Sequence, residues 1–98
     1  MGKKQTGAQA IQLRHILTDK HSKAVEALDK IKNGENFAKI AMEYSQDKAR
    51  AGGLLGLKQK TDLVEPISST AFNLPVNQPS DPVKSEFGYH ILLVEARK

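Results

Sequence analysis

The chain has 98 residues, of which 39% are hydrophobic and 27% charged, and its formal net charge is +4. These values are typical of one soluble globular domain, for which we expect a monomer. The absence of cysteine excludes a disulfide framework, a thiolate zinc site and a cysteine nucleophile. No apolar run is long enough to predict a membrane span or a signal peptide, so we expect a location in the cytoplasm, the nucleus or both.

The first half of the chain predicts a strand followed by two helices. Residues 1–8 are polar and favour a flexible arm, which leaves a domain at 9–98. Residues 11–17 alternate and predict a strand that carries His15 on an apolar face. Ser22 is a candidate cap for a helix that reaches about Asn33, with Val25, Leu28 and Ile31 on one face. Asn36 is a candidate cap for a second helix, whose inner face is Phe37, Ile40, Ala41 and Tyr44.

The second half predicts shorter elements. A helical turn is expected at 47–51 and a strand at 54–57. A further helix begins at Glu65-Pro66 and ends at Leu74-Pro75. Two strands follow, at 82–85 and at 89–96, and the second of these places His90 on a face with Leu92 and Val94. Helices and strands do not alternate regularly, so the pattern β-α3-β-α-β2 predicts an α+β fold with a largely antiparallel sheet.

The two strand histidines are the first candidate functional residues. If the first and last strands are neighbours, His15 and His90 can hydrogen-bond to each other. Such a pair can carry chemistry, or it can only join two strands, and the pattern leaves both readings open. The spacing of histidines and acidic residues has no metal-site signature, so no metal or cofactor is expected.

Four blocks of sequence carry a family resemblance. They are R-H-I-L at 14–17, Y-S-Q-D followed by G-G-L-L-G between 44 and 56, A-F-N-L-P-V at 71–76, and P-V-K-S-E-F-G-Y-H-I at 82–91. In this order they resemble the parvulins, a family of peptidyl-prolyl cis/trans isomerases, and most of all the small stand-alone eukaryotic members. The resemblance implies a four-stranded antiparallel sheet wrapped by about four helices, and rotamase activity on proline-containing polypeptides in protein folding.

The resemblance also implies roles for particular residues. His15 and His90 match the paired central histidines of the family, Asp47 occupies a position that is cysteine in the phosphate-directed branch, and Ser85 matches a hydroxyl residue near the histidines. The implied catalytic residues are therefore His15, Asp47, His90 and Ser85. The positions at which the family builds its proline pocket are Leu55, Leu63 and Ile67, and Phe72 is added as a substrate-binding residue.

Two features of the sequence bear on substrate choice. The family usually has phenylalanine where this chain has Ile67, which predicts a shallower pocket. The loop at 18–23 contains lysine but no arginine, so it lacks the bidentate donors that clamp phosphate, and we expect no dependence on phosphate. The alternatives to the enzyme are a chaperone-like module that binds proline peptides with little turnover, and weak nucleic-acid binding through the basic N-terminal arm.

Overall fold

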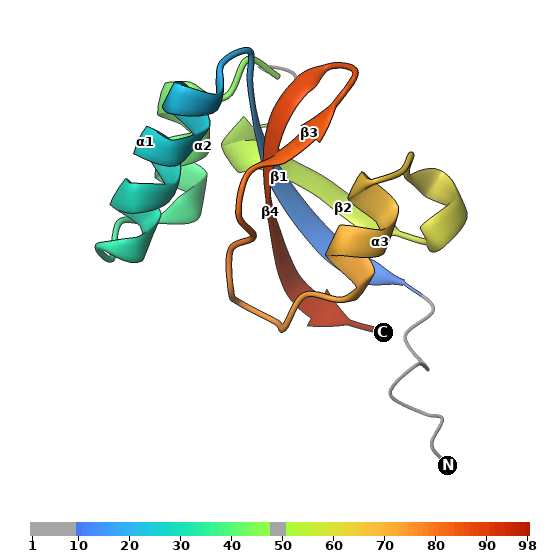
Figure 1. Cartoon of the computed structure of the whole chain (residues 1–98). Helices are drawn as coiled ribbons and strands as arrows, with labels where there is room; N and C mark the ends of the chain where they lie inside the picture. The colour runs from blue at the N-terminus through green and yellow to red at the C-terminus, as the bar shows by residue number, and fades with distance from the viewer. Residues whose placement is uncertain (1–9, 48–50) are drawn as a thin grey trace.

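The computed structural model describes residues 10–47 and 51–98. Its centre is a four-stranded antiparallel sheet with the strand order β2-β1-β4-β3 (Figure 1). The strands are β1 Ile11–Thr18, β2 Leu54–Lys58, β3 Val83–Ser85 and β4 Gly88–Arg97. The described helices are α1 His21–Lys32, α2 Phe37–Tyr44 and α3 Ile67–Phe72, with short 3-10 turns at η2 Ala51–Gly53 and η3 Lys60–Asp62. The predicted α+β fold is confirmed.

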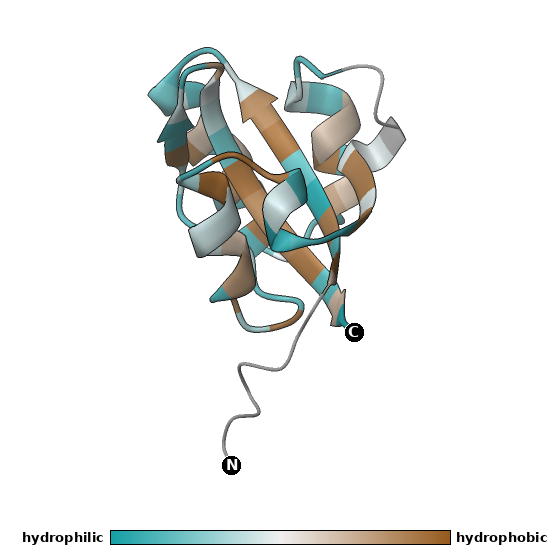
Figure 2. Ribbon diagram, turned by 90° about the vertical axis from the view of Figure 1, so that its right-hand side faces the viewer, coloured by the Kyte–Doolittle hydropathy of each residue, from teal (hydrophilic) through white to brown (hydrophobic). Residues whose placement is uncertain are grey.

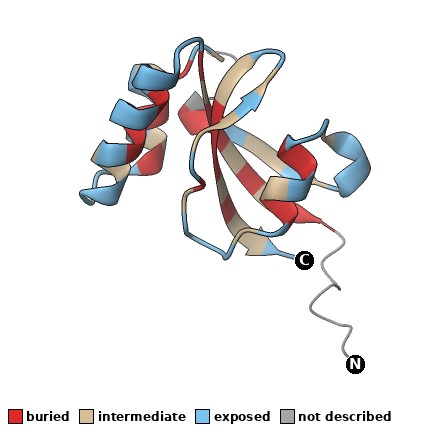
Figure 3. Ribbon diagram, in the orientation of Figure 1, coloured by how far each residue is buried: buried red, intermediate tan, exposed pale blue. Residues whose placement is uncertain are grey.

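Helices cover both faces of the sheet. Helices α1 and α2 lie on one face and α3 lies on the other (Figure 1). Buried residues line the central strands and the inner sides of the helices (Figure 3), and apolar residues run along the same strands (Figure 2). Burying one large apolar side chain stabilises a fold by about 1.5–3 kcal/mol. Strands β1 and β4 contribute to the clusters on both faces, so they form the stable centre of the domain.

The first of these clusters joins α1 and α2 to the sheet, and the second joins α3 to the opposite face. The buried members of the first are Ile16, Ala24, Ala27, Leu28, Phe37, Ile40, Ala41 and Ile91. The buried members of the second are Ile11, Leu13, Ile67, Ala71, Phe72, Leu92 and Val94.

Helix α1 differs from its prediction in two respects. Ser22 is not the cap: Lys20 holds that position, because its carbonyl accepts the amides of Lys23 and Ala24 and the hydroxyl of Thr18. Val25 is exposed, although it was expected on the inner face. The helix instead packs through Ala24, Ala27 and Leu28. Because alanine is small, the two alanines allow the helix to lie close to the sheet.

The predicted boundaries of the other helices agree only in part with the structure. Asn36 caps α2 as predicted, since its side chain accepts the amide of Lys39 at 3.1 Å. Helix α3 ends at Phe72 and not at Leu74, and the guanidinium of Arg97 donates to the carbonyls of both residues. The turn η3, which was not predicted, is closed by a capping box between Gln59 and Asp62.

Two predictions fall partly or wholly outside the described residues. The predicted arm at 1–8 is one of them. The helical turn expected at 47–51 is the other, because only its two end residues are described, and η2 begins at the last of them.

The two ends of the described domain pair with each other. The amide of Lys98 donates to the carbonyl of Ala10 at 2.8 Å, and the amide of Ala10 donates to the carbonyl of Lys98 at 3.4 Å. This pair continues the β1–β4 ladder, whose register begins at Ile11 and Arg97. The chain therefore enters and leaves the described domain at one point of the sheet (Figure 1).

Candidate active site

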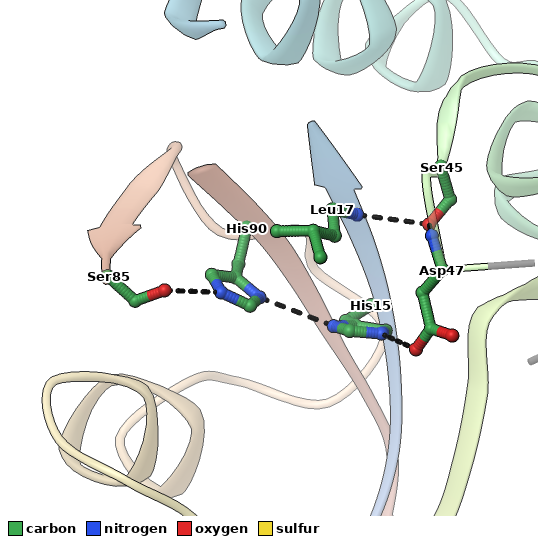
Figure 4. A network of polar contacts seen from close by, with 6 residues as sticks. All are labelled: His15, Leu17, Ser45, Asp47, Ser85 and His90. Atoms are coloured by element: carbon green, nitrogen blue, oxygen red, sulfur yellow. Dashed lines mark hydrogen bonds and ion pairs between the residues drawn. The ribbon is translucent and has the colours of Figure 1, made fainter. Parts of the chain in front are cut away.

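Four polar side chains form a continuous row across the sheet (Figure 4). His15 lies on β1, His90 on β4, Ser85 at the end of β3, and Asp47 in the segment after α2. His15 Nε2 is 3.0 Å from Asp47 Oδ2, the two Nδ1 atoms of His15 and His90 are 3.3 Å apart, and His90 Nε2 is 2.7 Å from Ser85 Oγ. The structure thus brings together all four residues for which the family resemblance implies a catalytic role.

The two histidines of the row are buried, and Asp47 is partly exposed. His15 and His90 are 7% and 6% exposed, whereas the Asp47 side chain is 25% exposed. Burial, together with the neighbouring His15, lowers the pKa of His90 from 6.5 to about 4. His90 is therefore neutral at pH 7, and one of its ring nitrogens has to accept a hydrogen bond.

One placement of hydrogens, with a single hydrogen on each ring, satisfies the contacts of the row. The Asp47 carboxylate can only accept, so His15 Nε2 carries a hydrogen and His15 Nδ1 accepts from His90 Nδ1. His90 Nε2 then accepts from the hydroxyl of Ser85, which accepts in turn from the amide of Phe87 at 3.1 Å. These hydrogen positions are assigned from the bonding pattern. All the donors point along the row toward Asp47.

Two neighbouring residues hold Asp47 and His15 in place. Ser45 is 2% exposed, and its hydroxyl accepts the amides of Leu17 at 3.1 Å and Asp47 at 3.3 Å. Gly53 lies against β1, where an added Cβ would be 2.2 Å from the carbonyl oxygen of His15. Ser45 joins the Asp47 segment to the strand of His15, and Gly53 allows the chain to pass close behind that strand.

Ser45 and Arg14 lie in the quoted sequence blocks, but no role was predicted for either side chain. Ser45 had a visible signal, because a serine two residues before an aspartate often accepts the i+2 amide. Arg14 had none that could be read locally. Its guanidinium bonds Glu95 Oε2 at 2.7 Å and the carbonyl of Gly52 at 2.9 Å, so it ties β4 and η2 to β1 beside His15.

The residues expected to form the proline pocket all belong to the second cluster or pack against it. Leu55 and Leu63 are partly buried and pack on this cluster. Ile67 and Phe72 belong to it and are only 5% and 6% exposed. Ile67 and Phe72 therefore offer little open surface, and the more accessible members of the set are Leu55 and Leu63.

A separate hollow lies between α3 and the loop that leads to β3. Its volume is about 550 Å³, and its lining includes Leu74, Pro79 and Pro82. None of the residues expected to bind substrate lines it. The row and the hollow are thus different features of the molecule.

The row suits a reaction that needs oriented dipoles next to an apolar surface. It carries one partly exposed carboxylate, two coupled imidazoles and a hydroxyl, with an apolar cluster on one side. Within residues 10–47 and 51–98, no group of three or more His, Cys, Asp or Glu side chains is arranged to hold a metal ion. In the same part of the chain, no helix is long and apolar enough to cross a membrane.

Comparison with known proteins identifies the family. The family model described as the PPIC-type PPIase domain matches residues 1–98. The chain is 51% identical over 96 residues to the peptidyl-prolyl cis-trans isomerase pin4 of Neurospora crassa, covering 94% of this chain and 74% of that protein. It is 48% identical over 99 residues to the pin4 protein of Emericella nidulans, covering 97% and 77%.

Solved structures agree with this result. The parvulin NmPin of Nitrosopumilus maritimus superposes with a TM-score of 0.82 at 42% identity, covering 91% of this chain and 98% of that one. A PrsA peptidylprolyl isomerase from Bacillus anthracis gives a TM-score of 0.89 at 32% identity, covering 97% and 45%.

The fold and the match of the whole chain therefore define a parvulin domain. The chain belongs to the PPIC-type peptidyl-prolyl isomerases, the parvulins. Its activity is cis-trans isomerisation of the bond before proline in polypeptides, and the similarity favours this activity over a binding module with little turnover.

Proposed function

We propose that Asp47, His15, His90 and Ser85 are the catalytic residues of this isomerase, and that Leu55, Leu63, Ile67 and Phe72 seat the substrate proline. The observation that carries the proposal is the unbroken row of hydrogen bonds that includes the partly exposed Asp47 carboxylate, next to the apolar cluster under α3.

The chemistry needs no covalent intermediate. The barrier to rotation is the loss of amide resonance, about 18–20 kcal/mol. A catalyst lowers it by binding the twisted amide better than either planar form. Asp47 supplies a fixed negative charge at the amide, and polar groups that are already oriented do not have to reorganise during the reaction. His15, held by His90 and Ser85, keeps that charge in position.

Independence from phosphate follows from the loop after β1. This loop has no arginine, and the ammonium of Lys23 lies 3.9 Å from the carboxylate of Glu26. Lysine is a point charge without the planar fork that binds phosphate bidentately. A peptide with phosphoserine before proline should therefore be turned over no better than its unmodified form, and a preference above about tenfold would contradict this.

Other parts of the proposal rest on the sequence alone. They are a monomeric state, a location in the cytoplasm or nucleus, and weak nucleic-acid binding by the basic arm, whose residues lie outside the described part of the chain.

The test compares Asp47→Ala with Asp29→Asn, an exposed residue of α1 on the opposite face. We expect Asp47→Ala to lower kcat/KM on X–Pro peptides by roughly tenfold or more, with the thermal unfolding midpoint nearly unchanged. Asp29→Asn should leave kcat/KM within about twofold of the parent. Full activity of Asp47→Ala would show that this carboxylate does not stabilise the twisted amide.

A further inference from the structure

A second apolar surface lies on the far side of the row from α3. Along β1, Leu13, His15 and Leu17 share one face of the sheet, and along β4, Leu92, His90 and Gly88 share it, with Leu17 paired to His90. Leu13 and Leu92 are buried under α3. The row therefore separates the apolar cluster under α3 from Leu17 and the β3–β4 turn.

Leu17 and Phe87 lie outside both buried clusters of the described residues. Leu17 is partly exposed, and Figure 4 shows its side chain beside the His90 ring. Phe87, in the turn between β3 and β4, is 61% exposed. A largely exposed aromatic ring can bury more of its apolar surface when it covers a ligand.

The turn that carries Phe87 is fixed against both Leu17 and the row. At Gly88 an added Cβ would lie 2.3 Å from the carbonyl oxygen of Thr18 and 3.4 Å from Leu17 Cδ1, so the two chains are in close contact there. The amide of Phe87 donates to Ser85 Oγ, which bonds His90. The position of Phe87 is thus set by the same hydrogen bonds that orient the histidines.

We propose that Leu17 and Phe87 form an apolar subsite for the side chain of X, the residue directly before proline. The inference rests on the proposed function. If the X–Pro amide lies at Asp47 and His15 with proline toward α3, then X lies on the other side of the row. Leu17 is two residues beyond His15 on β1, about 7 Å, which is within reach of a side chain on X.

The chemistry of this surface selects large apolar residues at X. The nearby side chains of Lys84 on β3 and Glu86 in the turn are exposed and opposite in charge, so they give a charged X no consistent attraction. The substrates favoured by the subsite are polypeptides with leucine, phenylalanine or methionine before proline.

The experiment measures kcat/KM on peptides that differ only at X, with alanine, leucine, phenylalanine, lysine and glutamate. The parent should turn over Leu–Pro and Phe–Pro roughly three- to tenfold faster than Ala–Pro. Phe87→Ala should bring these ratios close to one and leave Ala–Pro turnover within about twofold. Val25→Ala, an exposed apolar residue of α1, is the control and should leave the ratios unchanged.

A variant that adds a negative charge to the subsite gives a second measurement. Phe87→Glu should favour Lys–Pro over Ala–Pro by several-fold, an effect that weakens at high salt. Ratios that are the same in the parent, Phe87→Ala and Phe87→Glu, with unchanged thermal unfolding, would overturn the subsite. Failure of the proposed catalytic row has a different signature, because it appears as unchanged Ala–Pro turnover in Asp47→Ala.

Discussion

Replacing Gly53 by alanine tests whether the close packing of η2 against β1 holds His15 in position. Gly53 has φ +78°, a conformation that side chains with a Cβ rarely adopt, and its Cβ would lie 2.2 Å from the carbonyl oxygen of His15. Gly34, at the end of α1, is a matched control. Its φ is +101°, and an added Cβ there would meet no atom within 4 Å.

The two glycines share the backbone cost and differ in the clash. A left-handed backbone at a residue with a Cβ costs about 1–2 kcal/mol, which is the effect expected for Gly34→Ala. In Gly53→Ala the His15 strand and η2 would have to part by about 0.8 Å to reach 3.0 Å, the lower limit of ordinary Cβ contacts. Such overpacking adds typically 1–3 kcal/mol, so we expect a total loss of about 2–5 kcal/mol.

The assay is urea unfolding of both variants, together with kcat/KM on one X–Pro peptide. Because the displaced strand carries His15, Gly53→Ala should also lower kcat/KM by tenfold or more, roughly what a shift approaching 1 Å can cost. Gly34→Ala should retain the parent kcat/KM. Equal free energies of unfolding in the two variants, with equal activity, would refute the idea that β1 is packed against Gly53.

Three other predictions follow from the site. The pKa of His90 is lowered to about 4 in the fold, so the unfolded chain binds the proton more readily below pH 6.5. Stability should be full above pH 6.5, about 2 kcal/mol lower at pH 5 than at pH 8, and lost further down to pH 4, and His90→Asn should weaken this dependence in urea titrations. Ile67→Phe should raise kcat/KM if Leu55 and Leu63 leave room for the ring, but Ile67 is buried, so the thermal midpoint has to be measured with it, since overpacking costs about 1–3 kcal/mol. A variant that folds as well as the parent and is no faster would show that Ile67 does not limit the pocket. Activity should be equal with and without EDTA, and loss of activity on chelation would contradict a reaction that depends on side chains alone.

The strands and the histidine pair could be predicted because their signals are local and repeated, whereas the roles of Asp47 and Ser85 were implied only by the family resemblance. The alternation around His15 and the apolar run around His90 define two strands whose faces can be read directly. Pairing those strands brings the two imidazoles together, as the structure confirms.

What could not be predicted depends on partners far away in the chain. Helix α3 ends at Phe72, whose carbonyl accepts from Arg97, 25 residues later in the chain. Helix α1 presents Ala24 and Ala27 to the sheet, and alanine gives too weak an apolar signal to outweigh Val25 in a pattern. The low exposure of Ile67 and Phe72 is likewise set by packing against Leu13 and Leu92, which lie on other strands.

The pairing of Ala10 with Lys98 has a consequence for how this domain can be used in larger proteins. A unit whose ends meet can be inserted into a surface loop of another protein without forcing the two sides of that loop apart. Adjacent ends make such an arrangement sterically undemanding, because the rest of the longer chain has only to approach one corner of the sheet.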